Sequence, residues 1–165
     1  MDRLEKFTRY KSMVAFMVTL SILQTSSVGY AVSRPVDSER EARHMIQRTA
    51  VVIRAAHKQV TEHKVYTGDL ARAVAHQKFA KALFLRGDYI RSMHQTKWAR
   101  HLAVKAIIAN EGQTPAEATL TSQEEMQTAN GPPGVQLMKE LNASMPSEPM
   151  KDEALTNVKL NIDVE

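Results

Sequence analysis

The chain has 165 residues, of which 24% are charged and 43% hydrophobic, and this length and composition predict one modest domain. It contains no cysteine, which excludes a disulfide framework, a thiolate metal site and a cysteine nucleophile. The formal net charge of +4 hides an asymmetry, because residues 34–105 carry 15 Lys or Arg against 6 Asp or Glu, whereas residues 106–165 carry 3 against 10. A basic part followed by an acidic tail suits an anionic partner, self-association, or a tail folded back on its own domain.

Residues 1–31 have the pattern of a secretory signal peptide. Four basic residues precede an apolar run of 11 residues at 13–23, and the stretch up to Ala31 then turns polar and small. The run is well short of the roughly 20 apolar residues that span a bilayer, so we expect cleavage after Ala31 and export to a periplasm or to the outside of the cell. The alternative is an uncleaved segment that holds the protein at a membrane surface. No other membrane contact is expected.

Residues 37–110 are predicted to form three helices. The first begins at Ser38, which fits a capping box with Glu41, and small or apolar residues then recur at alternating spacings of four and three. This seven-residue repeat consists of Ala42, Ile46, Thr49, Ile53, Ala56, Val60 and His63. It predicts one long helix that packs along its whole length.

The second and third helices are predicted over residues 70–86 and 89–110. Gly68 is expected to end the first helix, Gly87 can adopt the left-handed conformation that ends the second, and Asp88 can cap the third. The inward stripes of these two helices are small: Ala73, His76, Ala80 and Leu83 on one, and Ser92, Thr96, Ala99, Ala103 and Ala106 on the other. Small residues let helix axes approach closely, so we expect a compact three-helix antiparallel bundle, an all-α fold.

The hairpin of the second and third helices resembles the tetratricopeptide (TPR) motif. The residues at its spacings are Phe79, Ala80, Leu83, Gly87, Tyr89, Ser92 and Ala99. The resemblance covers about one repeat of roughly 34 residues, and it departs from the motif in having Thr96 for the usual aromatic residue, no closing proline and no second copy. Because an isolated repeat cannot bury its own face, the first helix is expected to supply the missing layer. A TPR-like hairpin implies a protein-binding scaffold.

Residues 111–157 predict an acidic, partly disordered linker with short, frayed helices. Thr114 followed by proline, with Glu117 three residues on, has the pattern of a helix start, but few large apolar residues follow. Residues 130–134 (NGPPG) form a firm break in any helix.

Residues 158–165 alternate apolar and polar side chains without exception, which is the pattern of a half-buried β-strand. No other segment offers a convincing strand to pair with it. We therefore expect this segment to add to a sheet of a partner protein or to fold back locally.

Histidines are the candidate ligands for a metal ion or a haem in an exported protein without cysteine. The candidates are His57, His76, His94 and His101. His94 and His101 share a helix face but stand two turns, about 10 Å, apart, which is too far for direct ligation of one ion. His76 falls on an inward stripe and is more simply a buried interface histidine. No cofactor is expected, and a periplasmic metal-binding or small-ligand-binding protein is the alternative function.

The remaining patterns favour a protein that binds another protein. No Gly-rich phosphate loop, nucleophile elbow or paired carboxylates can be placed, so no catalysis is expected, and the Lys and Arg residues are spread round three helices, which disfavours a nucleic-acid partner. Trp98 is expected to pack under the first helix or the tail, or to act as an interface anchor. We expect an exported, non-enzymatic adaptor or accessory protein with candidate partner-binding residues Trp98, Val158, Leu160, Ile162 and Val164.

Overall fold

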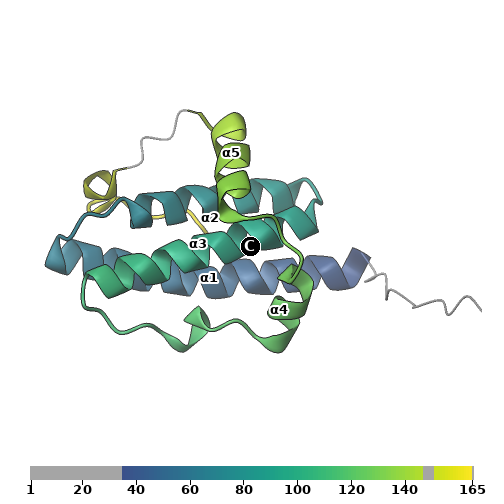
Figure 1. Cartoon of the computed structure of the whole chain (residues 1–165), viewed down its shortest axis with the longest axis horizontal. Helices are drawn as coiled ribbons and strands as arrows, with labels where there is room; N and C mark the ends of the chain where they lie inside the picture. The colour runs from purple at the N-terminus through teal and green to yellow at the C-terminus, as the bar shows by residue number, and fades with distance from the viewer. Residues whose placement is uncertain (1–34, 147–150, 165) are drawn as a thin grey trace, which may run out of the picture. The chain divides into compact units, whose positions relative to one another are not determined.

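The computed structural model describes residues 35–146 and 151–164, and this part of the chain is all-α (Figure 1). Its helices are α1 (Pro35–His63), α2 (Asp69–Leu85), α3 (Tyr89–Ala109), α4 (Ser122–Thr128) and α5 (Gly134–Ser144), with 3₁₀ turns at Ala116–Ala118 and Asp152–Leu155. The three long helices pack against one another as the predicted bundle. The predicted signal peptide, residues 1–31, lies outside the described residues. No helix in the described part is both long and apolar enough to cross a membrane.

The seven-residue repeat of α1 faces the other two long helices. Ala42, Ile46, Thr49, Ile53, Ala56 and Val60 are fully buried. The prediction is wrong for His63, which is exposed because it is the last residue of the helix, before the chain turns at Lys64 with a φ of 61°. The helix also begins earlier than expected, at Pro35, a residue favoured in the first turn. Ser38 therefore lies inside the helix instead of capping it.

The α2–α3 hairpin forms as the sequence predicts. Gly87 adopts a φ of 80°, and the side chain of Asp88 accepts a hydrogen bond from the backbone N–H of Arg91. All nine small-stripe residues are buried, and Ser92 Oγ donates to the carbonyl of Ala80 across the interface at 2.8 Å. The prediction that Gly68 ends α1 is wrong, because α1 ends at His63 and Gly68 precedes α2 in the left-handed conformation.

The predicted linker is helical over much of its described length. The expected helix start at Thr114 is wrong, since only a 3₁₀ turn follows, with Pro115 before it. The capping box stands seven residues later, where Thr121 and Glu124 exchange hydrogen bonds at the start of α4. Helix α4 packs on α3, and α5 packs on α2 and α3 (Figure 1).

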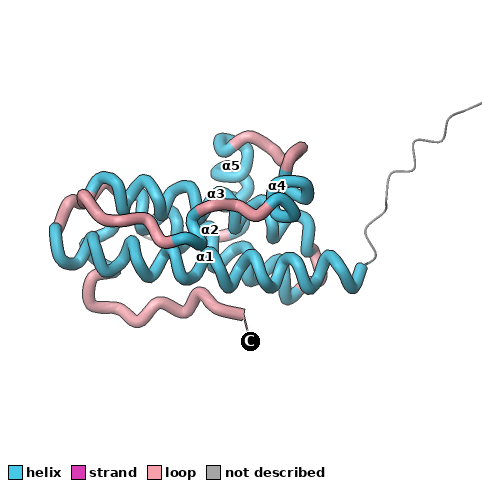
Figure 2. The backbone as a smooth tube through the Cα atoms, turned by 90° about the horizontal axis from the view of Figure 1, so that it is seen from below, coloured by secondary structure: helices cyan, strands magenta, loops and turns pink. Residues whose placement is uncertain are grey.

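The C-terminal segment 158–164 forms no strand; the described residues contain none. It lies in an irregular conformation alongside α1 and α2 (Figure 2). The alternation still has a structural effect, because Ile162 and Val164 are buried against these helices while Asn161 faces out to accept a hydrogen bond from Lys81. The apolar face therefore packs on the protein's own helices in this structure.

Candidate functional site: a pocket around Trp98

A buried ion pair fixes the tail to the bundle. Arg100 of α3 and Glu124 of α4 are 2% and 3% exposed, and two hydrogen bonds of 3.0 and 2.9 Å join the guanidinium to the carboxylate. Arg100 also donates to Thr49 Oγ1 and to the carbonyl of Met45, so it links α4 to α1 as well as α3. Arg48 of α1 donates to the same carboxylate at 2.5 Å.

The charge state of Glu124 follows from these partners. Burial on its own would raise the pKa of Glu124, but hydrogen bonds from Arg100 and from the backbone of Thr121, with the charges of Arg100 and Arg48, lower the pKa below its ordinary value. The carboxylate is therefore ionised at neutral pH and pairs with both arginines.

Three further tail carboxylates bind the helical part. Glu140 accepts hydrogen bonds from Arg91 and from Gln95, and Asp163 pairs with Arg54 at 2.9 Å. Asp152 caps α2 from a distance along the chain, accepting the backbone N–H groups of Gly68 at 2.7 Å and Ala71 at 2.8 Å. A carboxylate at a helix N-terminus satisfies orphan donors and complements the helix dipole. Four carboxylates of the acidic tail, Glu124, Glu140, Asp152 and Asp163, thus bind the helical part of the same chain.

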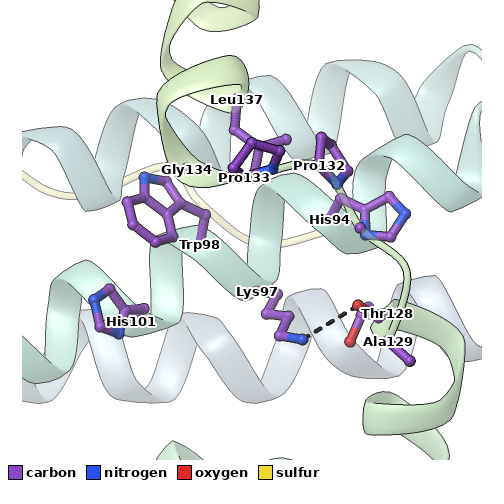
Figure 3. A pocket seen from close by; sticks show the side chains of 11 residues that line it. His94, Lys97, Trp98, His101, Thr128, Ala129, Pro132, Pro133, Gly134 and Leu137 are labelled. Carbon is purple, nitrogen blue, oxygen red and sulfur yellow. Dashed lines mark hydrogen bonds between the residues drawn. The ribbon is translucent and has the colours of Figure 1, made fainter.

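The folded tail leaves a pocket of about 320 Å³ against α3 (Figure 3). Helix α3 contributes His94, Lys97, Trp98 and His101, and the tail contributes Thr128, Ala129, Gly131, Pro132, Pro133, Gly134 and Leu137. The tail residues come from the end of α4, the connection to α5 and the first turn of α5. The break at residues 130–134 is therefore one wall of the pocket.

Two glycines let the tail approach α3 this closely. A Cβ on Gly134 would lie 2.3 Å from Trp98 Cζ2, and a Cβ on Gly131 would lie 2.5 Å from His94 Nδ1. Both distances are far below van der Waals contact, so any larger residue at either position must displace a ring. Trp98 thus packs against the tail, one of the two placements expected from the sequence.

The described residues that line the pocket include one cation, Lys97, and no carboxylate. Lys97 Nζ donates to the carbonyl of Thr128 at 3.2 Å (Figure 3). Burial first, and then the charge of Lys97, lower the pKa of His94 below its ordinary value, against the opposing charge of Glu140. The indole Nε1 of Trp98 is buried and has no hydrogen-bond partner in the described structure. Its ring stacks on His101 with centroids 4.9 Å apart.

A second hollow of about 250 Å³ adjoins the first along α3. It is lined by Lys97, Arg100, His101, Val104, Ala118 and Leu120. Since Lys97 and His101 line both hollows, they form a ridge between two partly apolar depressions.

The structure separates the four histidines proposed as ligands. His94 and His101 line the pocket, whereas His57 Nε2 lies 2.7 Å from the carbonyl oxygen of Leu155. His76 Nδ1 lies 2.6 Å from Gln95 Oε1 in the core, and burial lowers its pKa, opposed by that hydrogen bond. Across residues 35–146 and 151–164, no group of three or more His, Asp or Glu is placed to hold a metal ion.

The candidate partner-binding residues of the C-terminal segment differ in exposure. Val158 is 50% exposed and Leu160 is partly buried, whereas Ile162 and Val164 are buried among residues of α1, α2 and α3. Addition of this segment to a partner's sheet remains a prediction, and it requires the segment to leave its present position.

Sequence reasoning named the α3 half of the pocket in part and missed the tail half. The sequence marks Trp98, His94 and His101 as candidates. Nothing local distinguishes Lys97 from the other cations, and Gly131 and Gly134 predict only a break in a helix. The fold and site define an all-α bundle protein with a pocket built by its tail. Comparisons with protein-family models, curated proteins and solved structures found no match for this chain.

Proposed function

We propose that this chain is an exported, non-enzymatic helical adaptor or accessory protein that binds another protein through the pocket around Trp98. The leader-like residues 1–31 support export, and the pocket supports binding. The observation that carries the proposal is the construction of the pocket, in which ion pairs, helix caps and two glycines hold a tail against the chain's sole tryptophan and leave a hollow beside it.

The composition of the hollow favours a protein ligand. Tryptophan, which lines this hollow, is enriched at binding hot spots, and anchor side chains of partners commonly enter small apolar hollows with a few polar groups. The volume of about 320 Å³ lies at the low end of the roughly 300–1,000 Å³ typical of small-molecule sites. A side chain of a partner fits such a hollow without rearrangement of the tail.

Site-specific photocross-linking tests the proposal in the mature protein. A photoreactive phenylalanine analogue replaces His101 at the pocket, and in a matched protein it replaces His44, an exposed histidine of α1. An adaptor that uses the pocket gives a discrete adduct from position 101 that is absent from position 44. The purified partner then binds the wild type at least tenfold more tightly than Trp98→Ala, because loss of a hot-spot tryptophan costs about 2 kcal/mol. No adduct, or the same adducts from both positions, overturns the proposal.

The alternative, a small-ligand-binding protein, is favoured by one observation, the presence of His94 and His101 at the same pocket. Elemental analysis and an absorption spectrum of the protein as purified distinguish the two functions. Stoichiometric metal or a chromophore lost in a His94→Ala, His101→Ala double variant would establish the alternative. The export proposal has its own test, which is the intact mass of the secreted protein. This mass should equal that of a chain that begins at Val32.

A further inference from the structure

We propose that the partner segment bound at this site is a short acidic peptide, with a carboxylate over Lys97 and His101 and apolar side chains in the two hollows beside them. This inference rests on the proposed function and specifies the chemistry of the partner.

The arrangement of the two hollows favours an extended segment. They share Lys97 and His101, which stand one helical turn, about 6 Å, apart along α3. Apolar groups also line each hollow: Trp98, Pro133 and Leu137 in one, and Val104, Ala118 and Leu120 in the other. From one hollow to the other, across the ridge of Lys97 and His101, the order is therefore apolar, polar with the charge of Lys97, apolar. A peptide that presents apolar, acidic and apolar side chains in turn matches this order.

The charges of the site favour an acid over a neutral residue. Neither hollow is lined by an Asp or Glu. The nearby carboxylates are already engaged, Glu124 by Arg100 and Arg48, and Glu140 by Arg91 and Gln95. Lys97 donates to a carbonyl oxygen, and among the described residues no carboxylate pairs with it. Its charge is therefore left for a ligand.

The start of α5 adds to the recognition of a carboxylate. Gly134, the first residue of α5, lies against the ring atoms Cζ2, Cη2 and Cε2 of Trp98 at the pocket. The first turn of an eleven-residue helix presents unpaired N–H groups and a positive dipole end. Lys97 and the start of α5 line the same pocket, and both favour an anion there.

A random octapeptide display library, selected on the mature protein, tests the proposal. The expected result is enrichment of peptides with Asp or Glu between apolar residues. Synthetic copies should change the emission of Trp98, the sole tryptophan, and bind about fivefold more tightly than copies with Asn or Gln at the acidic position. This advantage should shrink when salt is raised to about 0.5 M, because exposed charges are then screened.

Variants separate recognition from structure. Lys97→Met should lower the affinity for acidic peptides about fivefold, whereas Lys97→Arg should keep it. Lys58→Met, which removes an exposed lysine of α1, should leave the affinity unchanged. The inference is overturned if Lys97→Met binds acidic peptides as tightly as the wild type does, when circular dichroism shows that both proteins are folded.

The other outcomes of the selection show whether the acidic-peptide inference fails alone or together with the proposed function. Enrichment of peptides without an acid overturns the acidic class while the protein-binding function stands. Failure to enrich any peptide over a Trp98→Ala selection also overturns the inference, and an adduct at position 101 then still supports the function. A response of Trp98 emission to 3-phenylpropionate as strong as that to the best peptide would assign the site to small acids and overturn both.

Discussion

Arg100 and Glu124 lie 24 residues apart and meet as a buried pair, each almost inaccessible to solvent. The pair joins the basic bundle to the acidic tail at the point where the chain would otherwise leave the three helices. Burying two charges is costly unless both are paired and hydrogen-bonded, and here the guanidinium and the carboxylate each have several partners. These polar contacts fix the tail together with apolar ones, since Leu141 and Ile162 of the tail are fully buried among the helices.

Glu124→Gln should lower the free energy of unfolding by about 3 kcal/mol, because it leaves Arg100 buried without a counter-charge. Urea denaturation followed by circular dichroism measures the change. Glu125→Gln is the matched control, since Glu125 is the exposed neighbour on the same helix and should shift stability by less than about 0.5 kcal/mol. Equal effects of the two substitutions would contradict the role of the buried pair.

The same carboxylate makes stability depend on pH. The pKa of Glu124 is lowered in the folded protein relative to its ordinary value of 4.5. A lowered pKa means that its contribution is fully present above the unfolded-state pKa and is lost as the pH falls through the folded-state pKa. Urea titrations at pH 7, 5 and 3 should therefore show the wild-type advantage over Glu124→Gln shrinking towards pH 3. An advantage that is constant or grows in acid would contradict this assignment.

Gly134→Ala should destabilise the protein by about 1–3 kcal/mol and shift the emission of Trp98, because the added Cβ meets the indole ring. Thermal denaturation and a fluorescence spectrum measure the two effects. Gly112→Ala is the comparison, since its added Cβ meets only the side chain of Gln59, which can move aside. If Gly134→Ala is as well tolerated as Gly112→Ala, the tail does not lie against Trp98.

Asp152→Ala should cost about 1–2 kcal/mol, a typical loss for a helix cap, since the N–H groups of Gly68 and Ala71 lose their acceptor. Hydrogen exchange of the Ala71 amide should accelerate more than exchange at the centre of α2. Glu153→Ala, an exposed neighbour, serves as the control and should leave this amide protected. Unchanged exchange in Asp152→Ala would show that the cap is absent in solution.

The three long helices were predictable because their burial has a period. The repeat of α1 and the small stripes of α2 and α3 each place one residue type on one face, and packing follows that face. The Gly87-Asp88 turn was predictable because few residues accept a positive φ or cap a helix. The ends of α1 were harder to predict. The helix begins at Pro35, before the capping signal at Ser38, and the chain turns at Lys64, before Gly68.

The position of α4 was not predictable in the same way, because polar contacts bind this helix and such contacts have no period. Glu124 is one of ten acidic residues after position 105, and nothing local distinguishes it from the exposed Glu125. Alternation in residues 158–164 did predict the burial of Ile162 and Val164, but Val158, on the same predicted face, is half exposed. It did not reveal that the surface covering Ile162 and Val164 is the protein's own helices, because a period of two fits a sheet or a groove equally well.

The most direct test of the central claim, that the tail forms one wall of a pocket on α3, is an engineered cross-link. A Cβ at position 131 would lie 3.3 Å from His94 Cγ, the atom whose place the Sγ of a cysteine takes, so an S–S bond of about 2 Å can join cysteines at the two positions. The chain has no native cysteine, so a His94→Cys, Gly131→Cys variant reports on this one contact. Mild oxidant should oxidise this pair quantitatively, with little oxidation of a His94→Cys, Asn142→Cys control. A pair that stays reduced, or that oxidises no faster than the control, would contradict it.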